Sequence, residues 1–238
     1  MSSPFTYRES GPASVLTFDD GKANVFNGDS VASLDEALDQ AAASDREVVI
    51  VTGRPGMFSA GLDLKTLPVL PEDQRRQAVT RYMEVMARLH LFEKPVITAA
   101  SGHALAGGCV MLLTGDVRIG AAGAFKVGTN ETRIGIALPS VVVRLAADAL
   151  PVASYPSVML HGRYHTPEEA LASGILHEVV EPDALLERAE GIAEGLTGID
   201  PTAYRNTKLR LRKAGIDAGL ARLPEELTAF FGSAAGIL

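Results

Sequence analysis

Two short apolar runs, each followed by a glycine-containing turn, constrain most strongly how this chain can fold. Residues 47–52 read Glu-Val-Val-Ile-Val-Thr, and residues 95–100 read Pro-Val-Ile-Thr-Ala-Ala. Largely apolar runs of this length, bounded by turn residues, are typical of strands that are covered on both faces of a sheet. The sequence therefore predicts a sheet with buried central strands and with other elements packed on each side.

Amphipathic helix patterns alternate with these runs. Residues 30–43 and 72–92 carry apolar side chains at the spacing of one helix face. Thr166 opens a capping-box sequence with proline at the first helical position, and Asp200 precedes a proline in the same manner. Strands alternating with helices predict an α/β layered fold with a helical C-terminal tail from about residue 200. Further strands are predicted at 14–18 and 116–119.

The composition excludes several classes of protein. Hydrophobic residues make up 47% and charged residues 21% of the 238 residues, as in ordinary globular domains. The net charge of −7, without a run of Lys or Arg, argues against a nucleic-acid partner. The single cysteine, Cys109, suits a reducing compartment, and the N-terminus lacks the pattern of a signal peptide. The apolar stretch 104–113 is too short to span a bilayer, so we expect a cytoplasmic protein without a membrane partner.

Two glycine-containing segments follow the buried strands and are predicted to open helices. The first, 58–65, reads Phe-Ser-Ala-Gly-Leu-Asp-Leu-Lys, and the second, 101–109, reads Ser-Gly-His-Ala-Leu-Ala-Gly-Gly-Cys. Backbone N–H groups at a helix start lack intrahelical acceptors, and small residues let a ligand approach them. Two such turns side by side would aim two donors at one oxygen, as in an oxyanion hole. Taken singly, each is more simply explained as a tight connection, and neither carries a dinucleotide or Walker phosphate-binding motif.

Together with 94–100 and 116–119, these segments resemble the enoyl-CoA hydratase/isomerase (crotonase) family in order and spacing. The resemblance covers about residues 13–210. It implies a crotonase-like α/β spiral of strand–strand–helix units over 1–195, followed by a C-terminal helical region over 196–238. It also implies an acyl-CoA thioester as substrate, no separate cofactor or metal ion, and assembly into a homotrimer or hexamer.

The resemblance assigns roles to individual residues. It implies that the backbone N–H groups of Ala60 and Gly107 form the oxyanion hole. Hydratases of the family use two glutamates, and in this chain Val110 stands at the position of the first and Glu131 at that of the second. The residues implied to bind the CoA substrate are Ala60, Gly61, Leu62, Asp63, Leu64 and Asn130.

The presence of one glutamate favours one reaction within the family. Removing a proton next to a thioester produces an enolate, which an oxyanion hole stabilises while a base takes the proton. Adding water needs a positioned water and proton delivery, which two carboxylates share. Moving a double bond needs only one base, which removes a proton at C2 and returns it at C4.

The sequence therefore predicts an isomerase of fatty-acid metabolism that converts 3-enoyl-CoA to trans-2-enoyl-CoA, with Glu131 as its sole base. Residues 130–136 also resemble the mitochondrial-type Δ3,Δ2-enoyl-CoA isomerases of this family. A catalytic Glu131 should have its pKa raised toward neutrality by apolar surroundings. The alternatives are an enoyl-CoA hydratase, which is a lyase, and a non-catalytic acyl-CoA-binding protein. In a solvated position, Glu131 would instead be an ordinary surface carboxylate or a partner of Arg133.

Other polar residues are interpreted as structural. His161 and His165 lie in a glycine-containing loop, and no metal site is predicted there. Asp116 is expected to support a turn. Four basic residues near the C-terminus are expected to form a solvated helix face, one of them a candidate contact for a CoA phosphate: Lys208, Arg210, Arg212 and Lys213.

Overall fold

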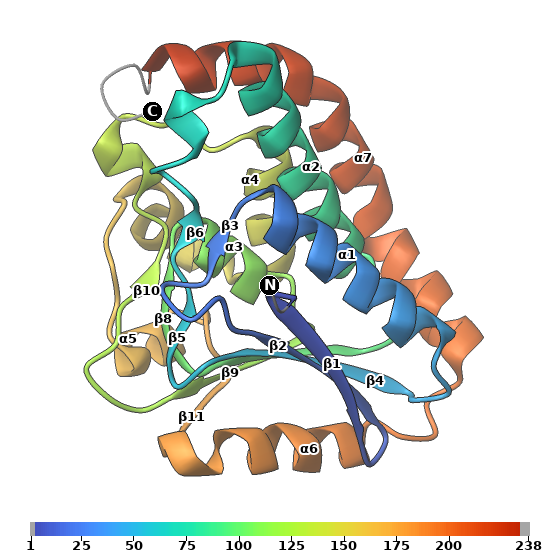
Figure 1. The fold of residues 1–238 in the computed structure, drawn as a ribbon. Helices are drawn as coiled ribbons and strands as arrows, with labels where there is room; N and C mark the ends of the chain where they lie inside the picture. The colour runs from blue at the N-terminus through green and yellow to red at the C-terminus, as the bar shows by residue number, and fades with distance from the viewer. Residues whose placement is uncertain (1–2, 234–238) are drawn as a thin grey trace.

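The computed structural model describes residues 3–233 (Figure 1). Within them the main sheet has six strands in the order β1-β2-β4-β7-β9-β11, with β1 antiparallel to β2 and the other neighbours parallel. The strands predicted at 14–18, 47–52, 95–100 and 116–119 are confirmed, with ends that differ by at most two residues. The bounds are β1 (Phe5–Ser10), β2 (Ala13–Phe18), β4 (Val48–Gly53), β7 (Val96–Ala100), β9 (Val117–Ala121) and β11 (Glu178–Val180).

Each turn of the chain adds a second, short strand beside the main sheet and then a helix. The short strands pair in the order β10-β8-β5, and β3 pairs with β6. This repetition of strand, strand and helix confirms the predicted spiral. The short strands are β3 (Val25–Phe26), β5 (Gly56–Ser59), β6 (Gly61–Leu62), β8 (Gly102–Leu105) and β10 (Val127–Gly128). The helices that follow are α1 (Gly28–Ala43), α2 (Glu72–His90), α3 (Gly107–Leu113) and α4 (Ser140–Ala149).

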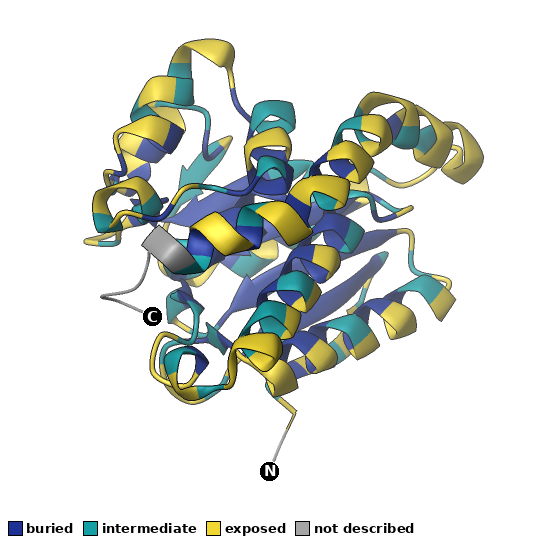
Figure 2. Ribbon diagram, turned by 90° about the horizontal axis from the view of Figure 1, so that it is seen from above, coloured by how far each residue is buried: buried dark blue, intermediate teal, exposed yellow. Residues whose placement is uncertain are grey.

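Both faces of the main sheet are covered, as the apolar runs predict. On β4, Val49 and Val51 belong to the core beneath α1 and α2, whereas Val48 and Ile50 pack toward α6 (Leu185–Gly195). Successive side chains of a strand point to opposite faces, so a strand that is buried on both sides is apolar at most of its positions. Figure 2 shows the central strands of the sheet buried, while the helices carry one buried and one exposed stripe.

The predicted helix starts at 166 and 200 are confirmed. Thr166 accepts a hydrogen bond from the N–H of Glu169, whose carboxylate accepts one from the N–H of Thr166. No described helix combines the length and hydropathy needed to cross a bilayer. The remaining elements are α5 (Pro167–Ala172), α7 (Pro201–Ser233) and five short helical turns: η1 (Leu67–Val69), η2 (Glu131–Ile134), η3 (Val152–Ser154), η4 (Pro156–Leu160) and η5 (Pro182–Ala184).

The C-terminal helix α7 packs against α4 and α2. It lies within the helical region predicted over 196–238, of which residues 234–238 fall outside the described residues. Its buried side chains face α2 and α4, and Figure 1 shows α7 running beside α2.

The prediction that the basic residues of this helix form a solvated face is wrong for Lys208 and Arg212. Lys208 is only 5% exposed, and its Nζ lies 2.7 Å from Oδ2 of Asp116. Nη1 of Arg212 lies 2.7 Å from Oδ1 of the same carboxylate. Asp116 also accepts a hydrogen bond from the N–H of Val96, so it does support its turn. Burial opposes the charge of Asp116, but the two cations outweigh it and lower its pKa.

Candidate active site

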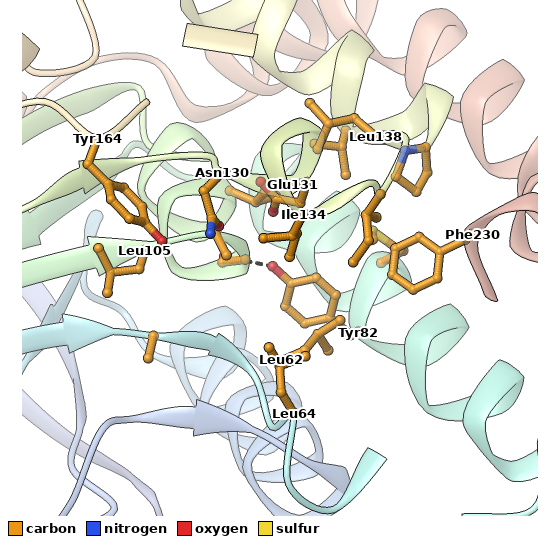
Figure 3. A pocket seen from close by; sticks show the side chains of 18 residues that line it. Leu62, Leu64, Tyr82, Leu105, Asn130, Glu131, Ile134, Leu138, Tyr164 and Phe230 are labelled. Atoms are coloured by element: carbon orange, nitrogen blue, oxygen red, sulfur yellow. Dashed lines mark hydrogen bonds between the residues drawn. The ribbon is translucent and has the colours of Figure 1, made fainter. Parts of the chain in front are cut away.

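A cavity of about 150 Å³ lies between β6, β8, the start of α3, and the helices α2, α4 and α7 (Figure 3). Most of its described lining is apolar, and the polar side chains in it are those of Tyr82, Asn130, Glu131 and Tyr164. At its mouth Leu64 is 47% exposed. At its deep end the lining residues are almost fully buried: Tyr82, Met83, Val110, Val142 and Phe230.

Glu131 projects into the middle of this cavity, at the start of η2 (Figure 3). Its Oε2 is buried and has no hydrogen-bond partner among the described residues. Burial raises the pKa of Glu131 to about 6, although backbone N–H groups at Glu131 and Asn130 partly oppose the rise. The expected shift toward neutrality is therefore confirmed, and the interpretation as an ordinary surface carboxylate is wrong.

The turn that carries Glu131 is held by backbone contacts. The N–H of Ile136 donates to the carbonyl oxygen of Glu131 at 2.8 Å and so closes the turn. Gly135, with a φ of 76°, provides the left-handed conformation that the turn requires. On the other side, Nε of Arg133 donates to the carbonyl oxygen of His161 at 2.9 Å. Arg133 is thus bonded to a neighbouring loop, and it forms no ion pair with Glu131 among the described contacts. These contacts fix the direction of the carboxylate.

Gly107 brings a backbone donor to the same cavity. Its N–H is at the first position of α3, after Ala106 with a φ of 50°, and has no acceptor among the described residues. A Cβ at this position would lie 2.8 Å from the hydroxyl oxygen of Tyr82, so the site accommodates only glycine without rearrangement. Gly107 and Glu131 line one cavity, and the segment predicted to open a helix does so here.

The first glycine segment differs from its prediction in two respects. It opens no helix, because β5 and β6 are followed by a turn and α2 begins only at Glu72. The N–H of Ala60 donates to the carbonyl oxygen of Ala23 at 3.0 Å, although Ala60 does line the cavity. A donor already engaged in this way is not available to a thioester oxygen, so the prediction that Ala60 supplies an oxyanion-hole N–H is wrong.

The next amides along this segment suggest which donor takes its place. The N–H of Gly61 donates to Oγ of Ser59, and that of Asp63 donates to the carbonyl oxygen of Phe26. Leu62 is the register partner of Phe26 in the parallel β3–β6 pair. In a parallel pair, one residue of each register pair bonds to the two residues that flank the other. Here Phe26 is the bonding residue, because it accepts from Asp63, which flanks Leu62. The N–H of Leu62 therefore points away from β3.

The other residues predicted to bind the CoA substrate fall into two groups. Leu62, Leu64 and Asn130 line the cavity, whereas Gly61 is buried against Gly107. A Cβ on Gly61 would lie 2.7 Å from the amide nitrogen of Gly107, so glycine permits this close approach. The carboxylate of Asp63 accepts hydrogen bonds from its own turn, at the N–H of Lys65 and the hydroxyl of Thr66. Their contacts with CoA stay predictions.

The structure adds three residues that sequence reasoning missed. The hydroxyl of Tyr82 donates to the carbonyl oxygen of Gly107 at 2.7 Å, and Tyr164 and Phe230 line opposite ends of the cavity. Tyr82 lies in the helix predicted over 72–92, but it was not singled out there. A signal was available there, because a buried tyrosine hydroxyl normally finds a partner. Phe230 and Tyr164 gave none, since each reaches the cavity only through tertiary packing.

Metal binding has no support in the loop that holds His161 and His165. Nε2 of His165 is the acceptor for Nε of Arg163 at 3.2 Å. Within residues 3–233, no three His, Cys, Asp or Glu side chains gather closely enough to hold a metal ion.

Comparison with known proteins identifies relatives that match most of the chain in sequence. The short-chain-enoyl-CoA hydratase of Clostridium acetobutylicum is 29% identical over 218 residues, which cover 89% of this chain and 83% of the relative. The mitochondrial enoyl-CoA delta isomerase 1 of Rattus norvegicus is 31% identical over 175 residues, covering 73% of this chain and 61% of the relative. The two named activities are thus matched at similar identity.

Solved structures agree with these matches. An apo enoyl-CoA isomerase of Mycobacterium tuberculosis, described in another structure as a probable enoyl-CoA hydratase, superposes with a TM-score of 0.88 at 32% identity, covering 95% of this chain and 100% of that one. The human mitochondrial delta3-delta2-enoyl-CoA isomerase superposes with a TM-score of 0.85 at 25% identity, covering 98% of this chain and 92% of that one. The model of the protein family described as enoyl-CoA hydratase/isomerase matches residues 9–231 of this chain. With its spiral fold, its cavity and this match over nearly its whole length, the chain belongs to the enoyl-CoA hydratase/isomerase family.

Proposed function

We propose that this protein isomerises 3-enoyl-CoA thioesters to trans-2-enoyl-CoA thioesters, with Glu131 as the base that moves the proton. One observation carries the proposal: among the described residues that line the cavity, Glu131 is the only carboxylate. Val110 stands where the family's hydratases have the first of their two glutamates, and it is a 2% exposed residue of the cavity lining. A site with one base and an apolar opposite wall suits proton transfer within a substrate better than activation of water.

The ionisation of Glu131 suits both halves of this reaction. With a pKa of about 6, most of the carboxylate is ionised at neutral pH, and its unpartnered Oε2 can accept the proton from C2. The resulting carboxylic acid is also acidic enough to return the proton at C4. A base with an ordinary surface pKa would be a weaker acceptor, and one with a much higher pKa would be mostly protonated.

We propose that the N–H groups of Gly107 and Leu62 hold the thioester oxygen. Gly107 has an unpaired amide at a helix start, and the amide of Leu62 points away from its paired strand. Backbone donors fixed by the fold stabilise a developing enolate without having to reorient. The close contact between Gly61 and Gly107 supports this pairing, because it brings the two turns together.

The competing function is enoyl-CoA hydration, which is favoured by the match to a named hydratase. Hydration would need another group to share the proton transfers with Glu131. The other ionisable side chains that line the described cavity are those of Tyr82 and Tyr164. Burial raises the pKa of both tyrosines, so both are neutral at working pH. The predictions of a homotrimer or hexamer, and of catalysis without a cofactor, stay predictions.

The decisive experiment assays wild type, Glu131→Gln and Glu181→Gln with matched 3-enoyl-CoA and 2-enoyl-CoA esters. Glu181 is exposed at the surface and serves as the matched control. We expect wild type and Glu181→Gln to convert 3-enoyl-CoA and to add no water to crotonyl-CoA, and Glu131→Gln to lose conversion. Hydration of crotonyl-CoA by wild type would favour the hydratase. Tight ester binding without any turnover would favour the non-catalytic binding protein.

A further inference from the structure

We infer that the deep end of the cavity admits only short acyl chains, and that Phe230 on α7 sets the limit. The inference rests on the proposed function only in taking an acyl-CoA thioester as the ligand. It concerns how far the chain can extend beyond the reacting carbons.

The burial of the lining residues defines the direction of the cavity. Leu64 at one end is 47% exposed, whereas Tyr82, Val142 and Phe230 at the other end are each at most 5% exposed. In the view of Figure 3, Glu131 lies between the side chains of Tyr164 and Phe230. A thioester that enters from the open end and places its C2 beside the carboxylate therefore directs its alkyl tail toward Phe230.

The volume of the whole cavity bounds the length of the acyl chain, counted from its thioester carbon. The cavity of about 150 Å³ equals the engineered apolar cavity known to hold one benzene molecule, so it takes roughly six carbon atoms. A longer chain would have to displace a side chain at the buried end. The walls there come from three helices, α2, α4 and α7, which pack against one another.

The position of Phe230 is fixed by the helix that carries it. Leu223, Leu227 and Phe230 are all buried and recur at the spacing of one helix face. The next residue, Phe231, has a different environment, because the guanidinium groups of Arg75 and Arg76 lie 5.4 Å and 5.9 Å from its ring centroid. Phe231 does not line the cavity. The two adjacent phenylalanines, whose rings meet edge to face with centroids 5.2 Å apart, thus provide a test residue that lines the cavity and a control of equal size that does not.

The test is the binding of saturated acyl-CoA esters, measured by titration calorimetry with hexanoyl-, decanoyl- and dodecanoyl-CoA. Saturated esters have no double bond to move, so the result is independent of whether the protein proves to be an isomerase, a hydratase or a binding protein. Each newly buried methylene should tighten binding about fourfold. For wild type we expect this gain to stop near six carbons, with decanoyl-CoA bound no more tightly than hexanoyl-CoA.

In Phe230→Ala the lost ring opens room for further methylenes, so the decanoyl-to-hexanoyl affinity ratio should rise by about tenfold or more. Phe231→Ala should keep the wild-type ratio. If Phe230→Ala fails to fold, Phe230→Leu should give a smaller rise in the same ratio. The inference is overturned if wild type already gains the full increment from hexanoyl to dodecanoyl. It is equally overturned if Phe230→Ala leaves the ratio unchanged, or if Phe231→Ala raises it as much.

Discussion

The hydroxyl group of Tyr82 donates a hydrogen bond of 2.7 Å to the carbonyl oxygen of Gly107, the residue whose N–H faces the cavity. Tyr82 is fully buried on α2, so the bond ties the first turn of α3 to a rigid neighbouring helix. We expect Tyr82→Phe to lower the free energy of unfolding by about 1 kcal/mol. Because the amide of Gly107 would be held less firmly, kcat should fall roughly fivefold while KM changes little. Urea unfolding and steady-state kinetics measure both effects, and an unchanged kcat would show that Tyr82 only supports the fold.

The pH dependence of activity should follow the ionisation of Glu131. Burial raises the pKa of Glu131 to about 6, and only the ionised carboxylate can accept the C2 proton. We therefore expect kcat/KM to increase as pH rises through about 6 and then to level off. A profile measured from pH 4 to pH 8 tests this. An acid limb centred near the ordinary value of 4.5 would mean that Glu131 is solvated in the working enzyme.

The same carboxylate should reduce stability at neutral pH. The folded protein holds the Glu131 proton up to a pKa of about 6, whereas the unfolded chain releases it near 4.5. The folded state thus binds more protons between these values, and stability falls as pH rises through this window. Above pH 6 the ionised group costs about 2 kcal/mol. We expect Glu131→Gln to be more stable than wild type by that amount at pH 7.5 and to lose this advantage near pH 4. Chemical denaturation at the two pH values checks the sign, and an equal difference at both would refute it.

Gly61 should be intolerant of any side chain. A Cβ there would lie 2.7 Å from the amide nitrogen of Gly107, and the residue has a φ of 86°. Gly61→Ala should push the two turns apart and reduce kcat/KM by about 100-fold, the usual effect of losing an oxyanion-hole donor.

Gly191 in α6 is the matched control for this substitution, because an added Cβ would meet nothing within 4 Å. Gly191→Ala should leave activity unchanged and stabilise the protein by about 0.5–1 kcal/mol. Retained activity in Gly61→Ala would contradict the proposed convergence of the two turns.

The buried ion network of Asp116 should contribute more to stability than the ion pairs at the surface. Asp116→Asn would leave Lys208 and Arg212 without their shared anion, and the uncompensated buried charge should cost about 3 kcal/mol. The exposed pair of Lys213 and Asp217 offers a comparison, because both side chains are about half exposed. Lys213→Met should cost less than about 1 kcal/mol. Thermal and urea unfolding compare the two, and equal costs would mean that the buried network is not important.

The strands and helices were largely readable from the sequence because their signals are local. The apolar run at 47–52 and the capping sequence at Thr166 specify burial and a helix start through residues that are close along the chain. The family motifs also placed Glu131 and Gly107, which line one cavity in the folded protein. Val110 was informative as well, because an apolar residue at that position reduces the carboxylates of the site to one.

Tertiary structure alone decided which amides are free, where the cavity ends, and which charges are buried. The N–H of Ala60 is used by a carbonyl 37 residues earlier in the chain, and Lys208 pairs with a carboxylate 92 residues away. Phe230 lines the same cavity as Glu131, which is nearly 100 residues distant in the sequence. Hydrogen bonding, burial and cavity shape arise from groups brought together only when the chain folds. No local pattern encodes such pairs, whereas periodicity and caps act between neighbours and so can be read from the sequence.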